Sequence, residues 1–270
     1  MTRPPVLDAH THAFPDRLAV EAVRKLAAGA RYCPVQPSHE GSLDSLLACM
    51  DRAGVTRAFV LSVATKPTQV TRITDWAGSI TSERLIPFAS IHPDFDEPER
   101  EAERIAGLGL RGIKFHPHYM DCTPDDPRAL RVARAAESAG LAMIFHAGYD
   151  MAFPQDPRAA PERLARVHEE VPRLPLLFAH LGGWRQWEQV LEHLAGRPVY
   201  LETSWVGGFC PPDLLSAIIE KHDPRYLLFG TDAPWRDPVK ELAHFTRFPL
   251  GEYARTQALW DNALRFVGMT

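Results

Sequence analysis

Residues 112–148 read GIKFHPHYMDCTPDDPRALRVARAAESAGLAMIFHAG and contain a strand, a helix and a second strand. The apolar runs Gly112–Phe115 and Ala142–Phe145 have the length of buried strands. Between them, Asp126 is typical of the residue that begins a helix, and Gly140 of the residue that ends one. This order indicates a parallel sheet whose strands are joined by a right-handed crossover.

The same alternation continues over the 270 residues of the chain. The apolar runs of strand length are Pro5–Ala9, Ala58–Val63, Leu85–Ile91, Gly112–Phe115, Ala142–Phe145, Leu176–Ala179, Val199–Leu201 and Tyr226–Phe229. Apolar residues at helical spacing lie between most of these runs, and the last helix is expected over Tyr253–Val267. Eight such units predict one α/β domain over residues 1–270, a (β/α)8 barrel of the TIM type. An open doubly wound sheet is the competing architecture, although no GxGxxG turn follows the first run.

The composition excludes several classes of protein. The 30 Lys and Arg residues against 34 Asp and Glu residues give a net charge of −4, which removes the electrostatic case for a nucleic-acid partner. No apolar run approaches the ~18 residues of a membrane span, and we see no apolar signal segment. The four cysteines form no CxxC pair and predict reduced thiols. We therefore expect a cytoplasmic protein that acts on a small molecule. A homodimer is expected only from the general frequency of homo-oligomers.

Side chains that can bind a metal follow five of the predicted strands. They are His10 and His12 after the first strand, His116 after the fourth, His146 after the fifth, His180 after the sixth and Asp232 after the eighth. In a barrel the C-terminal ends of the strands converge on one face, where active sites lie. The two-residue period of a strand places His10 and His12 on the same side. Imidazole and carboxylate are together ligands of zinc and similar ions, so the sequence predicts a metal site at this face.

The segments that carry these residues match the motifs of a known family. They are DAHTH at 8–12, GIKFHP at 112–117, IFHAG at 144–148, FAHLGG at 178–183, LFGTDAP at 228–234 and WDNALRFVG at 260–268. These motifs, in this order along the chain, resemble those of the amidohydrolase superfamily. Within it, the resemblance is to the amidohydrolase-related branch that includes the aminocarboxymuconate-semialdehyde decarboxylase-like enzymes.

The resemblance implies a distorted barrel with one divalent metal at its mouth, with Zn²⁺ expected and Mn²⁺ as the alternative. The metal ligands that it implies are His10, His12, His146 and Asp232. Asp232 is also implied as a general base, and His180 as an acid/base or polarising group beside the metal. A second metal is not expected. Lys114 resembles the bridging lysine of dinuclear relatives but stands two residues before the end of its motif. We expect it to be an interior lysine paired with an acid such as Glu202.

Two reactions suit such a site. A bound metal can lower the pKa of water from 15.7 to about 7, which favours hydrolysis of an amide, ester or lactone. Asp232 would take the proton from the water, and His180 would stabilise the developing oxyanion. The alternative is a metal-dependent, non-oxidative decarboxylation of a small unsaturated or aromatic acid. The resembled decarboxylases are generally longer than 270 residues, so hydrolysis is the main expectation.

Further residues are expected to line the mouth. The predicted substrate-binding residues are Lys114, His116, Trp205 and Arg236, and the other candidates are His92, His118, Trp184, Arg185 and Trp235. The three tryptophans follow consecutive strands and predict an aromatic wall, whereas an arginine would favour a carboxylate substrate. Asp8 and Glu202 are expected to support the ligand histidines by hydrogen bonds. The long segment 13–39 is expected to cover the site or to hold a helix over 17–28.

Overall fold

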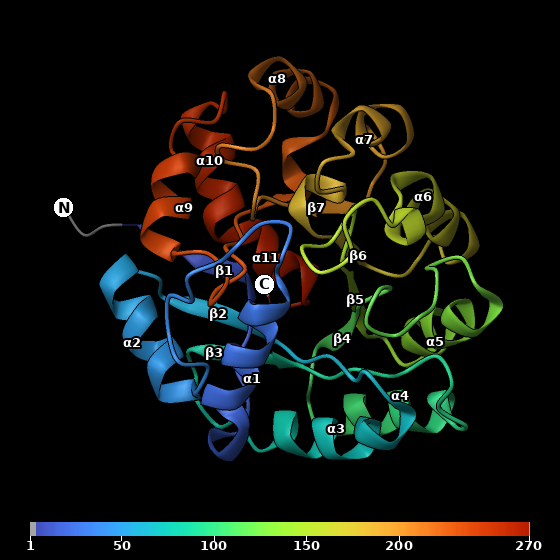
Figure 1. Ribbon diagram of the computed structural model, residues 1–270. Coiled ribbons are helices and arrows are strands. Elements are labelled where there is room, and N and C mark those ends of the chain that lie inside the picture. The colour runs from blue at the N-terminus through green and yellow to red at the C-terminus, as the bar shows by residue number, and fades with distance from the viewer. Residues whose placement is uncertain (1–3, 270) are drawn as a thin grey trace.

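Parallel strands form the centre of the computed structural model, which describes residues 4–269. The strands are β1 (Leu7–Thr11), β2 (Arg57–Leu61), β3 (Leu85–Phe88), β4 (Gly112–Phe115), β5 (Ala142–Phe145), β6 (Leu176–Phe178), β7 (Tyr200–Glu202) and β8 (Leu227–Leu228). Hydrogen bonds order them into the sheets β1-β2-β3 and β4-β5-β6-β7-β8. Bridges from Ala89 to Ile113 and from Thr11 to Ala233 join the two sheets at both edges. The result is the distorted (β/α)8 barrel that the sequence predicts (Figure 1).

Helices surround the strands on the outside (Figure 1). They are α1 (Asp16–Gly29), α2 (Leu43–Ala53), α3 (Val70–Gly78), α4 (Pro98–Gly107), α5 (Pro127–Ser138), α6 (Pro161–Glu170), α7 (Trp187–His193), α8 (Pro212–Lys221), α9 (Pro238–Phe245), α10 (Glu252–Leu259) and α11 (Asp261–Phe266). Asp126 caps α5 by accepting a hydrogen bond from the backbone N–H of Arg128, as its position predicts. None of the helices within residues 4–269 is both long and apolar enough to cross a membrane.

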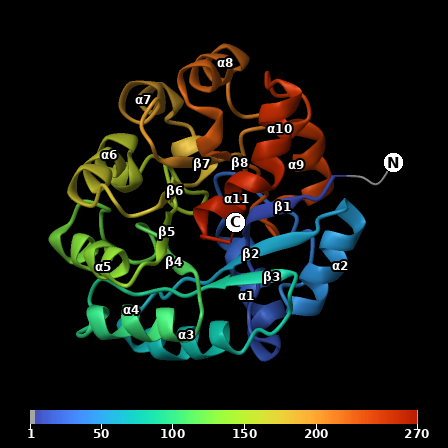
Figure 2. The same cartoon turned by 180° about the vertical axis from the view of Figure 1, so that it is seen from behind.

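The prediction of one terminal helix over Tyr253–Val267 is wrong, because the helix is interrupted at Trp260. The backbone of Trp260 has φ −151° and ψ −67°, which is outside the helical region, and α11 begins at the next residue. The break lets α11 lie across the end of the barrel opposite the mouth (Figure 2). There the Phe266 ring packs 6.2 Å from that of Phe59 and 5.1 Å from that of Tyr200, between ring centroids. Apolar periodicity continues through the break because both helices bury an apolar face.

The first strand also differs from its predicted bounds. It spans Leu7–Thr11 rather than Pro5–Ala9, and its register against β2 shifts between Asp8 and Thr11. Leu7 and Ala9 belong to the apolar cluster inside the barrel, so strict alternation would turn His10 away from the interior. Since a local irregularity re-aims side chains, the shift explains how His10 also reaches the interior.

Candidate metal centre and cavity

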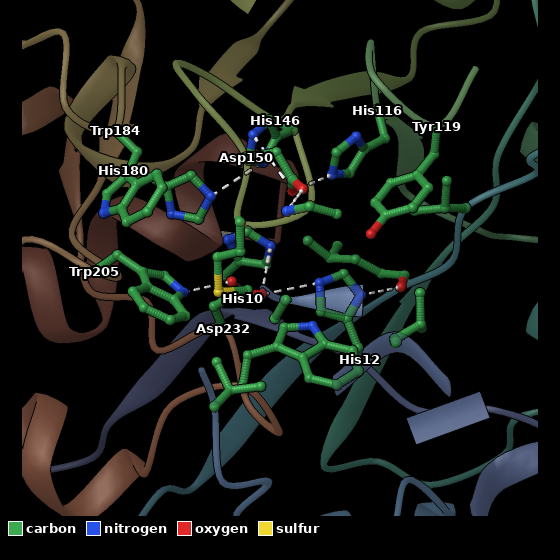
Figure 3. A pocket seen from close by; sticks show the side chains of 18 of the residues that line it. His10, His12, His116, Tyr119, His146, Asp150, His180, Trp184, Trp205 and Asp232 are labelled. Carbon is green, nitrogen blue, oxygen red and sulfur yellow. Dashed lines mark hydrogen bonds and ion pairs between the residues drawn. The ribbon is translucent and has the colours of Figure 1, made fainter. Parts of the chain in front are cut away.

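His10, His12 and Asp232 come together at the mouth of the barrel. The Asp232 Oδ1 atom lies 3.0 Å from His12 Nε2 and 3.3 Å from His10 Nε2. The three residues form one of the groups whose ligand atoms all lie within 4.8 Å of one another. Figure 3 shows both imidazoles pointing at this carboxylate, His10 from β1 and His12 from the residue after it. The structure therefore assembles three of the four predicted ligands.

The hydrogen bonds behind this group decide where its protons are. His12 Nδ1 lies 2.8 Å from the carbonyl oxygen of Leu61, and His10 Nδ1 lies 2.8 Å from Glu202 Oε1. Both partners can only accept, so each Nδ1 carries a proton and each Nε2 offers an electron pair. Asp232 Oδ1, which the two Nε2 atoms face, is buried and has no hydrogen-bond partner among the described residues.

Electron-rich atoms at such distances repel one another unless a cation lies between them. Burial lowers the pKa of the His10 imidazole well below its ordinary value, and the Lys114 ammonium lowers it further. A proton on His10 is therefore not the cation that this arrangement favours. Two imidazole nitrogens and a carboxylate oxygen are a donor set for Zn²⁺, Mn²⁺ and related ions. The residues present thus fit a divalent cation.

Asp232 is held from its other side by Trp205. The indole Nε1 donates a hydrogen bond to Asp232 Oδ2 at 2.7 Å, which leaves Oδ1 turned toward the histidines. Burial raises the pKa of this carboxyl, whereas positive charge beside it lowers the pKa, to about 2 when His10 and His12 carry that charge. The side chain is consequently a fixed carboxylate. The sequence places Trp205 in the cavity wall but gives no sign of this hydrogen bond.

His180 stands beside the centre, with its Nε2 3.2 Å from His146 Nδ1. Its Nδ1 lies 2.8 Å from Ser204 Oγ, and that hydroxyl donates to Glu202 Oε1 at 2.8 Å. The hydroxyl therefore accepts the Nδ1 proton, and His180 Nε2 keeps its electron pair. Burial lowers the pKa of His180, so the neutral form is favoured. Glu202 supports both His10 and His180, as expected of it, whereas Ser204 was not anticipated.

His146, the fourth ligand that the resemblance implies, belongs to a neighbouring group of polar side chains. Its Nε2 lies 3.1 Å from the carbonyl oxygen of Tyr149, so Nδ1 offers the electron pair, which faces His180 Nε2 at 3.2 Å. By ligand-atom distances His146 groups with His116 and Asp150 rather than with Asp232. Asp150 is a residue that the sequence reasoning missed. Its position, four residues after the histidine that follows β5, is the signal that could have found it.

Lys114 is fully buried and points at the centre. Its Nζ lies 3.4 Å from His10 Nε2. Within the described residues it forms no ion pair with Glu202, contrary to the expectation, because the acid is already engaged by His10, His180 and Ser204. Burial lowers the pKa of Lys114 to about 8.

The backbone is strained where it presents three of these side chains. His180, Trp205 and Asp232 have φ values of 60°, 62° and 63°, in the left-handed region that non-glycine residues rarely adopt. Such residues cost of order 1–3 kcal/mol each and cluster at functional sites.

Gly230 lets the backbone after β8 approach the Glu202 side chain closely, because a Cβ at Gly230 would lie 2.2 Å from Glu202 Oε2.

An open cavity of about 160 Å³ lies above the centre. Its aromatic lining residues are Phe14, Tyr119, Tyr149, Trp184, Trp205 and Trp235, and its charged and imidazole lining residues are His10, His12, Lys114, His116, His146, Asp150, His180 and Asp232. Segment 13–39 was expected to cover the site or to hold a helix, and it does both. It contains α1, and it contributes Phe14, Leu26 and Val35 to the cavity lining. Figure 3 shows the indoles and the Tyr119 hydroxyl around the imidazole cluster.

Four of the candidates lie outside the cavity lining. Arg236 pairs with Glu241 at 2.6 Å and covers the Trp205 ring from outside, because α9, which the sequence reasoning missed, brings Glu241 to it. Arg185 stacks on Trp184 and donates to the Tyr32 hydroxyl. The other two candidates are histidines that bond to nearby backbone groups outside the lining. His92 accepts a hydrogen bond from the backbone N–H of Asp94, and His118 Nε2 bonds to the carbonyl oxygen of Asp156. Among the described residues, no arginine lines the cavity.

The family model described as amidohydrolase matches residues 7–269, which is nearly the whole chain. The chain belongs to the amidohydrolase family. This agrees with the resemblance of its motifs and with a barrel whose polar residues gather at the C-terminal ends of the strands. No curated protein matches the sequence of this amidohydrolase.

Solved structures of low sequence identity share the fold of this amidohydrolase. The 5-carboxyvanillate decarboxylase of Sphingomonas paucimobilis is 19% identical with a TM-score of 0.74, and the match covers 99% of this chain and 100% of that one. A dihydroxybenzoic acid decarboxylase from Polaromonas, solved with manganese and 2-nitroresorcinol, is 15% identical with a TM-score of 0.70, over 99% and 98% of the two chains. A probable 2-pyrone-4,6-dicarboxylic acid hydrolase from Acinetobacter baumannii is 15% identical with a TM-score of 0.65, over 97% and 99%.

Proposed function

We propose that this amidohydrolase is a metal-dependent decarboxylase of a small aromatic or unsaturated monocarboxylic acid. The observation that carries the proposal is the set of electron-rich atoms of His10, His12 and Asp232 at the floor of a cavity with aromatic walls. The likeness to two decarboxylases supports the choice of reaction. One of them is matched over its full chain, so the size of this protein does not disfavour decarboxylation.

The size and charge of the cavity select the substrate class. A volume of about 160 Å³ is close to that of a cavity of about 150 Å³ that holds one benzene ring. Trp184, Trp205 and Trp235 offer flat apolar faces to such a ring. Lys114, the only Lys or Arg of the described lining, lies beside His10, so it and the cation would place their positive charge at one end of the cavity. One carboxylate finds its partners there, whereas a second carboxylate farther along the ring would be unpaired. A monocarboxylate therefore fits better than the dicarboxylate named for the pyrone hydrolase.

The residues of the chain divide the work of the reaction. A divalent cation held by His10, His12 and Asp232 would supply positive charge for the substrate carboxylate. Cleavage of the bond between the ring carbon and the carboxyl releases CO₂ and leaves an electron pair on the carbon, which must receive one proton. His180 lines the cavity and is supported through Ser204 by Glu202. Its neutral imidazole would take up one proton from solvent water at Nε2 and deliver that proton to the carbon.

Hydrolysis of an amide, ester or lactone is the second candidate. The same His180 favours it, because a neutral imidazole whose Nδ1 is fixed by Ser204 is also arranged to take a proton from water. The two reactions differ in their product: decarboxylation releases CO₂ and consumes a proton, whereas ester or lactone hydrolysis releases acid.

The test uses protein loaded separately with Mn²⁺ and Zn²⁺ and a panel of benzoic acids, unsaturated acids, lactones and esters. The proposal predicts CO₂ release from at least one acid, and no release by Asp232→Asn. Acid release from a lactone or ester without any CO₂ release would replace decarboxylation by hydrolysis. Activity that survives in Asp232→Asn would remove the centre from the reaction altogether.

A further inference from the structure

Asp150 and His116 form a second polar group on the cavity wall, apart from the centre described above. Both residues are buried and both line the cavity. A row of imidazoles connects the two regions. The rings of His10 and His180 stack with centroids 5.3 Å apart, and those of His146 and His116 stack at 4.2 Å. The rings of His180 and His146 meet edge to face at 4.9 Å. Figure 3 shows Asp150 and His116 on the side of the cluster away from Asp232.

The two side chains face each other without a hydrogen bond. Asp150 Oδ2 lies 3.6 Å from His116 Nε2 and 4.0 Å from His146 Nε2, and both distances exceed a hydrogen bond. Asp150 Oδ1 is occupied, because it accepts from the backbone N–H of Ala152 at 2.7 Å. His116 Nδ1 is buried with no partner among the described residues, so its proton is better placed on Nε2, toward the carboxylate.

The cavity face beside these two atoms has the hydrogen-bonding pattern of a hydroxyl group, because atoms 3.6 Å apart can both bond to one oxygen next to them. A hydroxyl can donate to Asp150 Oδ2 and accept from His116 Nε2–H at the same time, which satisfies both groups. A carboxylate there would face Asp150 with like charge, and no arginine of the described cavity lining offsets it. A methyl or hydrogen would leave both groups unpaired in an apolar surrounding.

We propose that Asp150 and His116 form a subsite that recognises a hydroxyl group on the substrate ring. This inference rests on the proposed function, because it takes the cavity as the place where an aromatic carboxylate binds. It extends that function by naming the substrate class as hydroxylated aromatic monocarboxylates and Asp150 as the residue that selects them. Asp150 contacts the substrate in this account but does not take part in bond cleavage.

The test is a binding measurement that needs no turnover. Calorimetry on Mn²⁺-loaded protein compares benzoate with 2-, 3- and 4-hydroxybenzoate and with the three benzenedicarboxylates. A buried hydrogen bond to a charged group contributes about 1.5–3 kcal/mol, so one hydroxybenzoate isomer should bind roughly 10- to 150-fold more tightly than benzoate. The dicarboxylates should bind more weakly than benzoate.

Asp150→Asn should weaken both preferences, because it removes the charge and keeps an Oδ1 atom for Ala152. The gain from the hydroxyl should fall at least 5-fold, and the dicarboxylates should approach benzoate. His116→Gln should also reduce the affinity gained from the hydroxyl, so the test does not depend on a single variant. The matched control is Asp121→Asn, an exposed carboxylate paired with Arg158, which should leave every affinity unchanged.

The outcomes distinguish a failure of the subsite from a failure of the proposed function. If benzoates bind but no hydroxyl increases affinity, or if Asp150→Asn changes neither preference while its melting temperature is native, the subsite is refuted alone. If no benzoate binds to the metal-loaded protein at all, the proposed function fails, and the subsite fails with it.

Discussion

The hydrogen bond from Trp205 to Asp232 should control how tightly the centre binds a metal. Trp205→Phe keeps an aromatic ring in the cavity wall and removes only the Nε1–H that fixes Asp232 Oδ2 at 2.7 Å. The carboxylate can then rotate, and the orientation of Oδ1 must be imposed when the cation binds. We expect the protein to keep its fold and to lose metal affinity.

The magnitude follows from the kind of bond that is lost. A hydrogen bond to a charged group contributes about 1.5–3 kcal/mol, which sets an upper limit of roughly 150-fold. Groups that orient a ligand from behind typically change metal affinity by about 10- to 100-fold. We therefore expect Mn²⁺ and Zn²⁺ to bind Trp205→Phe about 10- to 100-fold more weakly, measured by competition with a fluorescent chelator.

The structure provides a matched control. Trp184 lies 5.7 Å from Trp205 between ring centroids and lines the same cavity, but its Nε1–H has no partner within the described residues. Trp184→Phe should therefore leave metal affinity unchanged. The role of the Trp205 hydrogen bond is refuted if Trp205→Phe binds metal like the wild type, or if both variants weaken metal binding equally.

Three other predictions test separate parts of the structure. His180→Ala should retain its metal and lose turnover at least 100-fold; loss of metal in elemental analysis would instead make His180 a ligand. Phe266→Ala should lower the free energy of unfolding by about 3–5 kcal/mol in denaturant titrations, because the ring fills the barrel end, and a loss under 1 kcal/mol would contradict that role. Burial raises the pKa of Glu241 to about 7, although Arg236 opposes the shift, so the folded protein holds this proton more tightly than the unfolded chain. Stability should then fall as pH rises from about 4.5 to 7, by at most about 3 kcal/mol relative to Glu241→Gln, and parallel curves for the two proteins would exclude this effect.

Local sequence patterns were sufficient to predict the alternating order of strands and helices. Asp126 and Gly140 mark the ends of a helix through capping and left-handed geometry, which are properties of adjacent residues. The gathering of His10, His12 and Asp232 also followed from the sequence, since parallel strands in a barrel must end at one face. Neither inference required knowledge of side-chain packing.

Features that depend on distant residues were not predictable in the same way. Arg236 follows β8 as a substrate-binding arginine would, but Glu241 on α9 captures it. The break at Trp260 serves the packing of α11 into the barrel, and no residue near it carries a helix-stop signal. The role of Asp150 depends on the distance between its Oδ2 and His116 Nε2, which only the folded chain sets.

The metal content of the protein tests the central claim most directly. Elemental analysis after loading with Mn²⁺ or Zn²⁺ and removal of free metal should give about one ion per wild-type chain. His12→Asn, which removes one of the three converging donors, should retain less than a tenth of that amount at the same melting temperature. A wild-type chain that holds no metal, or a His12→Asn variant that holds as much as the wild type, would contradict the assignment of His10, His12 and Asp232 as the metal centre.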